Sequence, residues 1–258
     1  MPGRDTLCER IRTVNLIKKI IMGVIMAALI SGLVGCNLVN VSETDAIAKS
    51  LSDKYNKDFV VTAIGNRYNY DTATAYAYAA EDPSLRFVIN ADSVGNLEYD
   101  SYAYRCVCRK VENIINDAFE KNGLSVENFV VFRIPNYNIP ADITIKDYAS
   151  TMNCDKVVSA VAVKSAHEAM SEKLIKAFED VDKLLSGFTV TYRLYLLSES
   201  DFAKAKDIIR TETTIFDLLR LESYGLGDEI SDYSVDVSAG KPDKTAHEID
   251  ENLFGEVT

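Results

Sequence analysis

The sequence has few of the residues on which most enzyme sites depend. It contains no tryptophan and only two histidines, His167 and His247, in 258 residues. A zinc site or a Ser-His-Asp triad would have to use one of these two, because histidine is a common zinc ligand and the base of the triad. The sequence also contains no Gly-rich phosphate loop and no Gly-x-Ser-x-Gly, His-Glu-x-x-His or Cys-x-x-Cys motif. We therefore expect no catalytic residue, no cofactor and no metal site.

Three short patterns have the residue types of a catalytic site but lack its context. Ser238–Lys241 has the Ser-x-x-Lys spacing of penicillin-recognising enzymes, which place the serine at a helix start and need two further motifs that are missing here. Asp180–Asp182 and Asp228–Glu229 bring carboxylates together, as a general acid–base pair requires. A chain with 39 acidic residues contains such neighbours without any function. We interpret all three patterns as solvated surface.

Five cysteines are spread over the chain, and they divide by role. Cys8 and Cys36 flank a long apolar run, which leaves Cys106, Cys108 and Cys154, an odd number that does not describe a disulfide framework. The first two of these three are two residues apart on an expected helix. Their side chains should point about 200° apart, so they should not bridge each other or hold one metal. Either of them could still pair with Cys154.

The apolar run is the strongest signal in the sequence. Ile20–Val34 contains 15 residues without a charge and follows Lys18 and Lys19. A membrane-spanning helix needs roughly 20 apolar residues, whereas the apolar region of a signal peptide needs only about 7–15. The length therefore predicts a signal peptide over residues 1–35.

The run ends in Leu33-Val34-Gly35-Cys36, which resembles the lipobox of bacterial lipoproteins. The resemblance implies that a diacylglyceryl group is attached to the Cys36 thiol, that cleavage occurs just before Cys36, and that the new amino terminus is often acylated. The protein would then be held on the extracytoplasmic face of the cell membrane through lipid on Cys36. An uncleaved or ordinarily cleaved signal is the alternative. The basic segment before the run is long, and initiation at Val14 or Leu16 would shorten it.

The charge balance limits the partners of the remaining chain. The chain has 28 basic and 39 acidic residues, and the first 35 residues contain five of the bases and two of the acids, so 23 bases and 37 acids follow, a net charge of −14. Nucleic acid and anionic lipid head groups both require clustered Lys and Arg. We therefore expect no nucleic-acid partner, and a membrane contact made by the lipid alone.

After a tether over residues 36–42, the periodicity predicts an N-terminal unit over residues 43–122. Apolar residues at helical spacing predict helices, and three runs of period two separated by turns predict an antiparallel meander. Its elements are a helix that begins at the capping-box-like Ser42–Asp45, strands at Phe59–Tyr68, Thr72–Ala80 and Leu85–Ala91, and a helix over Ser101–Asn122. The unit is therefore α-β-β-β-α.

The middle strand of this meander has two different faces. Alternate positions from Ala73 to Ala79 are all alanine, which allows a helix to pack closely, and Tyr76 and Tyr78 point to the other side. Seven tyrosines gather in this region: Tyr68, Tyr70, Tyr76, Tyr78, Tyr99, Tyr102 and Tyr104. They either complete a thin core or form a docking surface at Tyr76 and Tyr78, because aromatic residues with polar tips are enriched at interfaces.

The second unit, over residues 123–240, mixes helices and strands. A strand, a helix of about twenty residues and another strand form a crossover long enough for parallel pairing. The expected elements are strands at Asn128–Ile134, Asp155–Lys164, Phe188–Leu197 and Tyr233–Val237, and helices at Ile145–Met152, Ser165–Leu184, Asp201–Arg210 and Ile215–Glu222. Residues 241–258 are acidic and predicted to be a flexible tail. The fold class is α+β, with a C-terminal mixed α/β unit that contains a β-α-β crossover.

These observations favour a lipid-anchored extracytoplasmic module that binds a partner, such as an envelope protein, without catalysis. The alternatives are a small-ligand receptor of a transport or sensing system and an unrecognised envelope enzyme. A flat tyrosine face would favour the interaction module, and an apolar cleft between the two units would favour the receptor. A buried carboxylate cluster with raised pKa would favour the enzyme.

Overall fold

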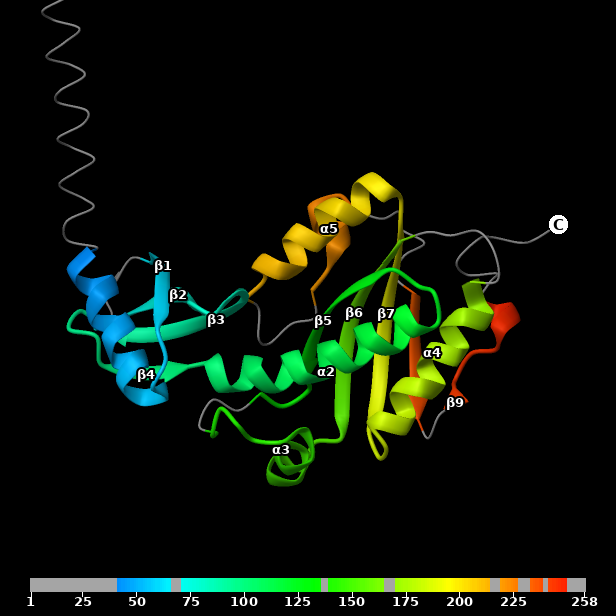
Figure 1. The fold of residues 1–258 in the computed structure, drawn as a ribbon, viewed down its shortest axis with the longest axis horizontal. Helices are drawn as coiled ribbons and strands as arrows, with labels where there is room; N and C mark the ends of the chain where they lie inside the picture. Colours follow the sequence, from blue (N-terminus) through cyan, green and yellow to red (C-terminus); the bar gives the residue numbers. More distant parts are fainter. Residues whose placement is uncertain are drawn as a thin grey trace, which may run out of the picture.

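The computed structural model describes residues 41–65, 71–135, 139–164, 170–213, 219–226, 233–238 and 241–249. Over these ranges the chain forms an antiparallel four-stranded sheet followed by a mixed five-stranded sheet, with helices on both (Figure 1). The predicted α+β class is confirmed. No helix in the described ranges has both the length and the apolar character that crossing a bilayer requires.

The first sheet is the predicted meander. Its strands are β1 (Phe59–Ile64), β2 (Thr72–Ala79), β3 (Asp82–Asp92) and β4 (Leu97–Asp100), paired antiparallel in that order. A helix over residues 41–55 buries Ile47 and Leu51 against the alanines of β2, which are themselves buried. The small side chains allow this close approach, so the predicted alanine face is confirmed as the helix-packed face.

Two local predictions in this unit are wrong, and one strand was missed. Residue 41 is already helical, and the Thr44 hydroxyl donates to the Val41 carbonyl inside the helix, so Ser42–Asp45 does not start it. Strand β3 begins at Asp82, within the expected turn. Strand β4 was not predicted at all. Its buried Asp100 accepts hydrogen bonds from the Lys54 ammonium and the Tyr55 hydroxyl, both at 2.7 Å, which are tertiary contacts without a local signal.

Helix α2 (Tyr102–Lys121) joins the two sheets. The helix has an apolar stripe that is buried, with Tyr104, Cys108 and Phe119 inaccessible to solvent, and most of this stripe packs on the second sheet. Tyr102 packs in the core of the first sheet instead. Cys106 is half-buried against that core and not on a polar face, because the N-terminal turn of α2 is covered on two sides. The predicted boundary after Asn122 therefore separates α2 from the sheet on which most of it packs.

The second sheet runs in the order β5-β6-β7-β8-β9. Strands β6 and β7 are parallel, as the crossover predicts, and the other neighbours are antiparallel. Helices α2 and α4 cover one face and α5 the other (Figure 1). The remaining bounds are β5 (Val126–Phe132), α3 (Ile145–Met152), β6 (Lys156–Lys164), α4 (Met170–Leu184), β7 (Thr189–Leu197), α5 (Glu199–Thr211), a 3-10 turn (Leu221–Tyr224), β8 (Tyr233–Ser238) and β9 (Lys241–Pro242).

The free edge of β5 is capped by polar side chains of α2. The Tyr104 hydroxyl accepts from the Phe132 N–H at 2.9 Å, and the Glu112 carboxylate accepts from the Val130 N–H at 3.1 Å. Arg105 donates to the Val130 carbonyl at 3.0 Å and forms an ion pair with Glu112 at 2.8 Å. Both charged side chains are almost fully buried. These groups replace the neighbouring strand that an edge strand lacks.

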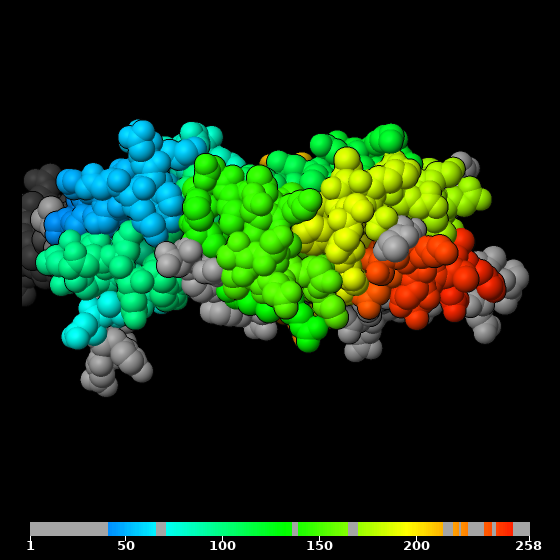
Figure 2. Space-filling model, turned by 90° about the horizontal axis from the view of Figure 1, so that it is seen from below, coloured from blue at the N-terminus to red at the C-terminus, as the bar shows by residue number. Residues whose placement is uncertain are grey.

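Residues 241–249 are part of the fold, which corrects the prediction of a loose tail from Lys241 onward. Strand β9 pairs with β8, and Ile249, in a short helical segment over residues 246–249, is buried in the main core. Residues 41–100 lie at one end of an elongated body and residues 241–249 at the other (Figure 2). Residues 250–258 lie outside the described ranges.

Candidate functional site

The face of the first sheet opposite the helix over residues 41–55 carries the two tyrosines singled out from the sequence. We call it the tyrosine face. Tyr78 lies directly opposite Arg86 of β3, and Tyr76 opposite Ala63 of β1, so these four side chains share one face. The Tyr76 side chain is 39% exposed, and Tyr78 is half-buried. A β-bulge at Thr62 shifts the register of β1, and the Thr62 hydroxyl donates to the Tyr76 carbonyl at 3.1 Å.

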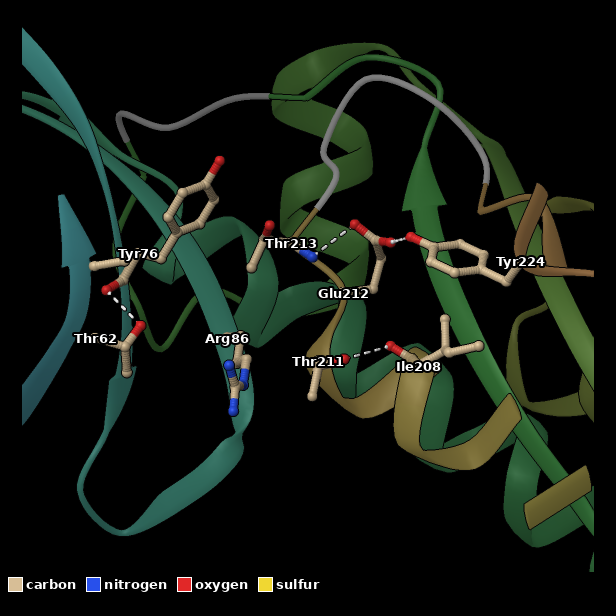
Figure 3. A pocket seen from close by; sticks show the side chains of 9 residues that line it. Thr62, Tyr76, Arg86, Ile208, Thr211, Glu212, Thr213 and Tyr224 are labelled. Atoms are coloured by element: carbon tan, nitrogen blue, oxygen red, sulfur yellow. Dashed lines mark hydrogen bonds between the residues drawn. The ribbon is translucent and has the colours of Figure 1, made fainter. Parts of the chain in front are cut away.

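The C-terminal end of α5 lies close to this face, because α5 contacts β3 as well as the second sheet. Between them is a cleft of about 390 Å³. Figure 3 shows Tyr76 and Arg86 on the side of the sheet and Glu212 and Tyr224 on the opposite side. The described residues that line the cleft are Thr62, Ala63, Tyr76, Arg86, Ile208, Thr211, Glu212, Thr213 and Tyr224.

Arg86 is the cation of this cleft. Its guanidinium carbon lies 6.0 Å from the centre of the Tyr78 ring, within the range of a cation–π interaction. Its Nε is buried and has no hydrogen-bond partner, and no ion pair joins Arg86 to a carboxylate in the described part of the chain. A buried donor without an acceptor is unfavourable. Arg86 is therefore a cation at the wall of the cleft that no carboxylate of the described residues neutralises.

Glu212 places a negative charge on the opposite wall. One carboxylate oxygen accepts from the Thr213 N–H at 2.8 Å, and the other accepts from the Tyr224 hydroxyl at 3.2 Å. The charge of Glu212, together with partial burial and this hydrogen bond, raises the pKa of Tyr224 above its ordinary value. The Tyr224 hydroxyl therefore stays protonated and holds the carboxylate in place.

The structure separates the other candidates from this cleft. Ser238 and Lys241 are cross-strand partners at the ends of β8 and β9, so the serine does not start a helix as a Ser-x-x-Lys nucleophile would. His247 is exposed at the far end of the body. Asp180 is held by Lys183, Lys121 and Asn122, which lower its pKa well below the usual range. Cys36, His167 and Asp228–Glu229 lie outside the described ranges.

Cys106, Cys108 and Cys154 are all free thiols, so the disulfide to Cys154 that the sequence left open is not formed. Within the described ranges, no three His, Cys, Asp or Glu side chains are grouped as a metal site would require.

The sequence did not point to Arg86, Glu212 or Tyr224. Arg86 carried a usable signal, because it alternates with the apolar residues of β3 and so must share the outer face with the tyrosines. Glu212 and Tyr224 lie more than a hundred residues after Arg86 in the sequence, and no local pattern predicts that they come close to the first sheet.

The chain matches no known family model and no curated protein. Among solved structures, its fold is similar to the crystal structure of a DUF5037 family protein from Ruminococcus gnavus ATCC 29149, with a TM-score of 0.65 and 16% sequence identity. The match covers 83% of this chain and 99% of that chain. At this identity the similarity shows a shared fold and nothing about activity.

Proposed function

We propose that the protein is a lipid-anchored extracytoplasmic binding protein that holds its ligand, without catalysis, in the cleft between the tyrosine face and α5. The observation that carries this proposal is Arg86, a cation at the wall of a concave site that no carboxylate of the described residues neutralises. The volume of about 390 Å³ lies within the range of about 300–1,000 Å³ that small-ligand pockets occupy. A cleft between two parts of a chain is also a common place for a ligand.

The resolved pKa shifts favour binding over acid–base catalysis. Among the described residues, four carboxyl groups have a displaced pKa: Asp92, Asp180, Asp201 and Glu248. In each the displacement is downward, caused mainly by hydrogen bonds to the charged form. A general acid near neutral pH needs the opposite displacement. None of these four lines the cleft.

A ligand screen tests the binding role. The full-length chain, purified in detergent, is melted by far-UV circular dichroism against pools of metabolites, metal ions and cell-wall fragments. A ligand at about a hundred times its dissociation constant adds roughly 2.7 kcal/mol of stability. The matched variants are Ala63→Trp, which fills the exposed wall of the cleft, and Val94→Trp in a distant exposed turn. We expect at least one pool to raise the melting temperature of the wild type and of Val94→Trp, but not that of Ala63→Trp. If no pool raises the melting temperature of the wild type, the proposal is contradicted.

The anchor is tested separately. We expect a clickable fatty acid fed to cells to label the wild-type chain and not a Cys36→Ser variant, which should leave the membrane fraction. Two or three acyl chains give stable attachment whereas one gives only marginal attachment. Labelling of the Cys36→Ser variant, or its retention in membranes, contradicts lipidation at this residue.

Docking of an envelope protein is a second candidate, and the 39% exposure of Tyr76 favours it. A photo-reactive phenylalanine analogue at Tyr76, compared with the same residue at Val94 in living cells, tests it. A discrete adduct specific to Tyr76 supports protein docking, and equal cross-linking from both positions contradicts it.

A further inference from the structure

Three hydroxyl groups of the cleft donate their proton within the protein. The Thr62 hydroxyl donates to the Tyr76 carbonyl at 3.1 Å, and the Thr211 hydroxyl donates to a backbone carbonyl of its own helix, α5, at 2.9 Å. The Tyr224 hydroxyl donates to the Glu212 carboxylate at 3.2 Å. A hydroxyl has one proton and two acceptor lone pairs, so each of these oxygens can only accept from a further partner. A ligand of this cleft therefore has to bring its own donors.

These three acceptor hydroxyls come from separate elements. Thr62 lies in β1, Thr211 ends α5, and Tyr224 ends the 3-10 turn (Figure 3). A single ammonium group donates around one point, whereas the hydroxyls of a sugar ring present donors in several directions. Two more hydroxyl side chains, Tyr76 and Thr213, belong to the same lining. Five of the nine described lining residues thus carry a hydroxyl, which favours a polyhydroxylated ligand.

The ring of Tyr76 is suited to the apolar side of a sugar. Tyr76 is 39% exposed, and its small cross-strand neighbour Ala63 leaves the ring accessible. A sugar ring carries hydroxyls around its edge and C–H groups on its faces. The face of an aromatic ring is electron-rich and attracts such weakly positive groups. Tyr76 can therefore support the ring of the ligand while the threonine hydroxyls accept from its edge.

Arg86 is suited to a carboxylate on the same ligand. It is the one cation among the described residues that line the cleft, and no carboxylate of the described residues pairs with it. A guanidinium only donates, and its planar fork matches the two oxygens of a carboxylate. A phosphate carries a charge of about −1.5 to −2 at neutral pH, of which one guanidinium neutralises only part. The described charges therefore favour a carboxylate over a phosphate.

We infer that the cleft binds a uronic acid or a related carboxylated sugar, with its carboxylate on Arg86, its ring against Tyr76 and its hydroxyls donating to the three acceptor hydroxyls. This inference rests on the proposed binding function and names the class of its ligand. The volume of about 390 Å³ suits a small ligand of this kind and not a folded partner.

Isothermal titration calorimetry tests the ligand class, with the full-length chain in a detergent that has no sugar head group. Glucuronate and galacturonate carry both hydroxyls and a carboxylate, glucose and galactose lack the carboxylate, and cyclohexanecarboxylate lacks the hydroxyls. We expect at least one uronate to bind, and the neutral sugars and cyclohexanecarboxylate to bind at least ten-fold more weakly, which is about 1.4 kcal/mol. A hexose phosphate should also bind more weakly than the uronate.

A free sugar acid and the acidic end of a glycan share this chemistry. The methyl glycoside of the bound uronate, in which the anomeric hydroxyl is blocked, mimics the end of a chain. Binding as tight as that of the free uronate points to a glycan, and weaker binding points to a free sugar acid. Either result supports the ligand class.

Variants assign the two kinds of contact. Arg86→Gln should remove the preference for uronates over neutral sugars. Thr211→Val, which deletes one acceptor, should weaken uronate binding by roughly 2- to 10-fold and leave that preference in place. Arg133→Ala, at an exposed arginine away from the cleft, is the matched control and should bind like the wild type. Circular dichroism checks the fold; if Arg86→Gln does not fold, Arg86→Lys replaces it and should reduce the preference, because it loses the fork.

Several results overturn the inference. Neutral sugars that bind the wild type as tightly as the uronates remove the carboxylate contact, and equally tight binding of cyclohexanecarboxylate removes the hydroxyl contacts. Tighter binding of a hexose phosphate contradicts the assigned charge. If neither uronate binds, the ligand class is wrong. The binding function then survives if a pool of the metabolite screen still raises the melting temperature of the wild type and not that of Ala63→Trp, and it fails too if that screen is silent.

Discussion

Replacing Glu112 should be among the most destabilising single changes in this protein. The residue is 3% exposed, and its carboxylate forms the ion pair with Arg105 and also lies 3.0 Å from the Arg109 Nε. Removing one partner of a buried ion pair typically costs about 3–5 kcal/mol, because the other charge is left uncompensated. Whole domains are stable by only roughly 5–15 kcal/mol. We expect Glu112→Gln to lose a large part of the free energy of unfolding.

A double replacement separates the ion pair from its second role. Apolar residues often replace a buried ion pair without loss of stability. Here Arg105 and Glu112 also satisfy the carbonyl and N–H of Val130 at the free edge of β5. Arg105→Met with Glu112→Leu would leave both backbone groups buried and unpaired, at a cost of about 1–3 kcal/mol each. We therefore expect the double variant to remain clearly less stable than the wild type.

Urea unfolding followed by far-UV circular dichroism measures both effects. With a slope of about 2–3 kcal/mol per molar urea, a loss of about 3–5 kcal/mol lowers the midpoint by about 1–2.5 M. Asp53→Asn is the control, because its ion pair with Lys49 is 67% exposed on the aspartate side and should contribute less than about 1 kcal/mol. A double variant as stable as the wild type would refute the view that these side chains cap the edge of β5.

The parts of the fold that the sequence predicted are those with a local cause. The alternation of alanine and tyrosine in β2 identified both faces of that strand. The spacing of apolar residues gave α2, and the strand–helix–strand length gave the parallel pair β6 and β7. The failures have tertiary causes. Strand β4 depends on a buried aspartate whose partners lie on another helix, and the end segment depends on one apolar residue, Ile249, in an acidic stretch.

The candidate site was half predictable for the same reason. Tyr76 and Tyr78 could be placed on the open face of the first sheet from their alternation alone, and Arg86 could have been placed with them. The opposite wall could not, because Glu212 is positioned by the end of α5, a helix that packs on the second sheet and reaches the first only through the tertiary fold. A site shared between two units becomes visible only when their packing is known.

Three further experiments probe individual contacts. The Thr144 hydroxyl caps α3 by accepting from the Asp147 N–H at 3.1 Å. Thr144→Ala should therefore lower the free energy of unfolding, measured by urea titration, by about 1 kcal/mol. An unchanged urea midpoint would show that this cap does not stabilise the fold. Burial raises the pKa of the Cys108 thiol to about 12, so iodoacetamide at pH 8 should label it only after unfolding, as judged by peptide mass spectrometry; rapid labelling of the native chain would contradict its burial. The pKa of Asp180 is lower in the folded state than in the unfolded state. The ionised carboxylate therefore stabilises the fold at pH values above the ordinary carboxyl pKa of about 4, and this stabilisation is lost as the pH falls through the pKa of the folded state. Asp180→Asn should therefore lose less stability than the wild type when urea midpoints at pH 7 are compared with those at pH 3. Parallel losses in the two proteins would mean that Lys121 and Lys183 do not bind this carboxylate in solution.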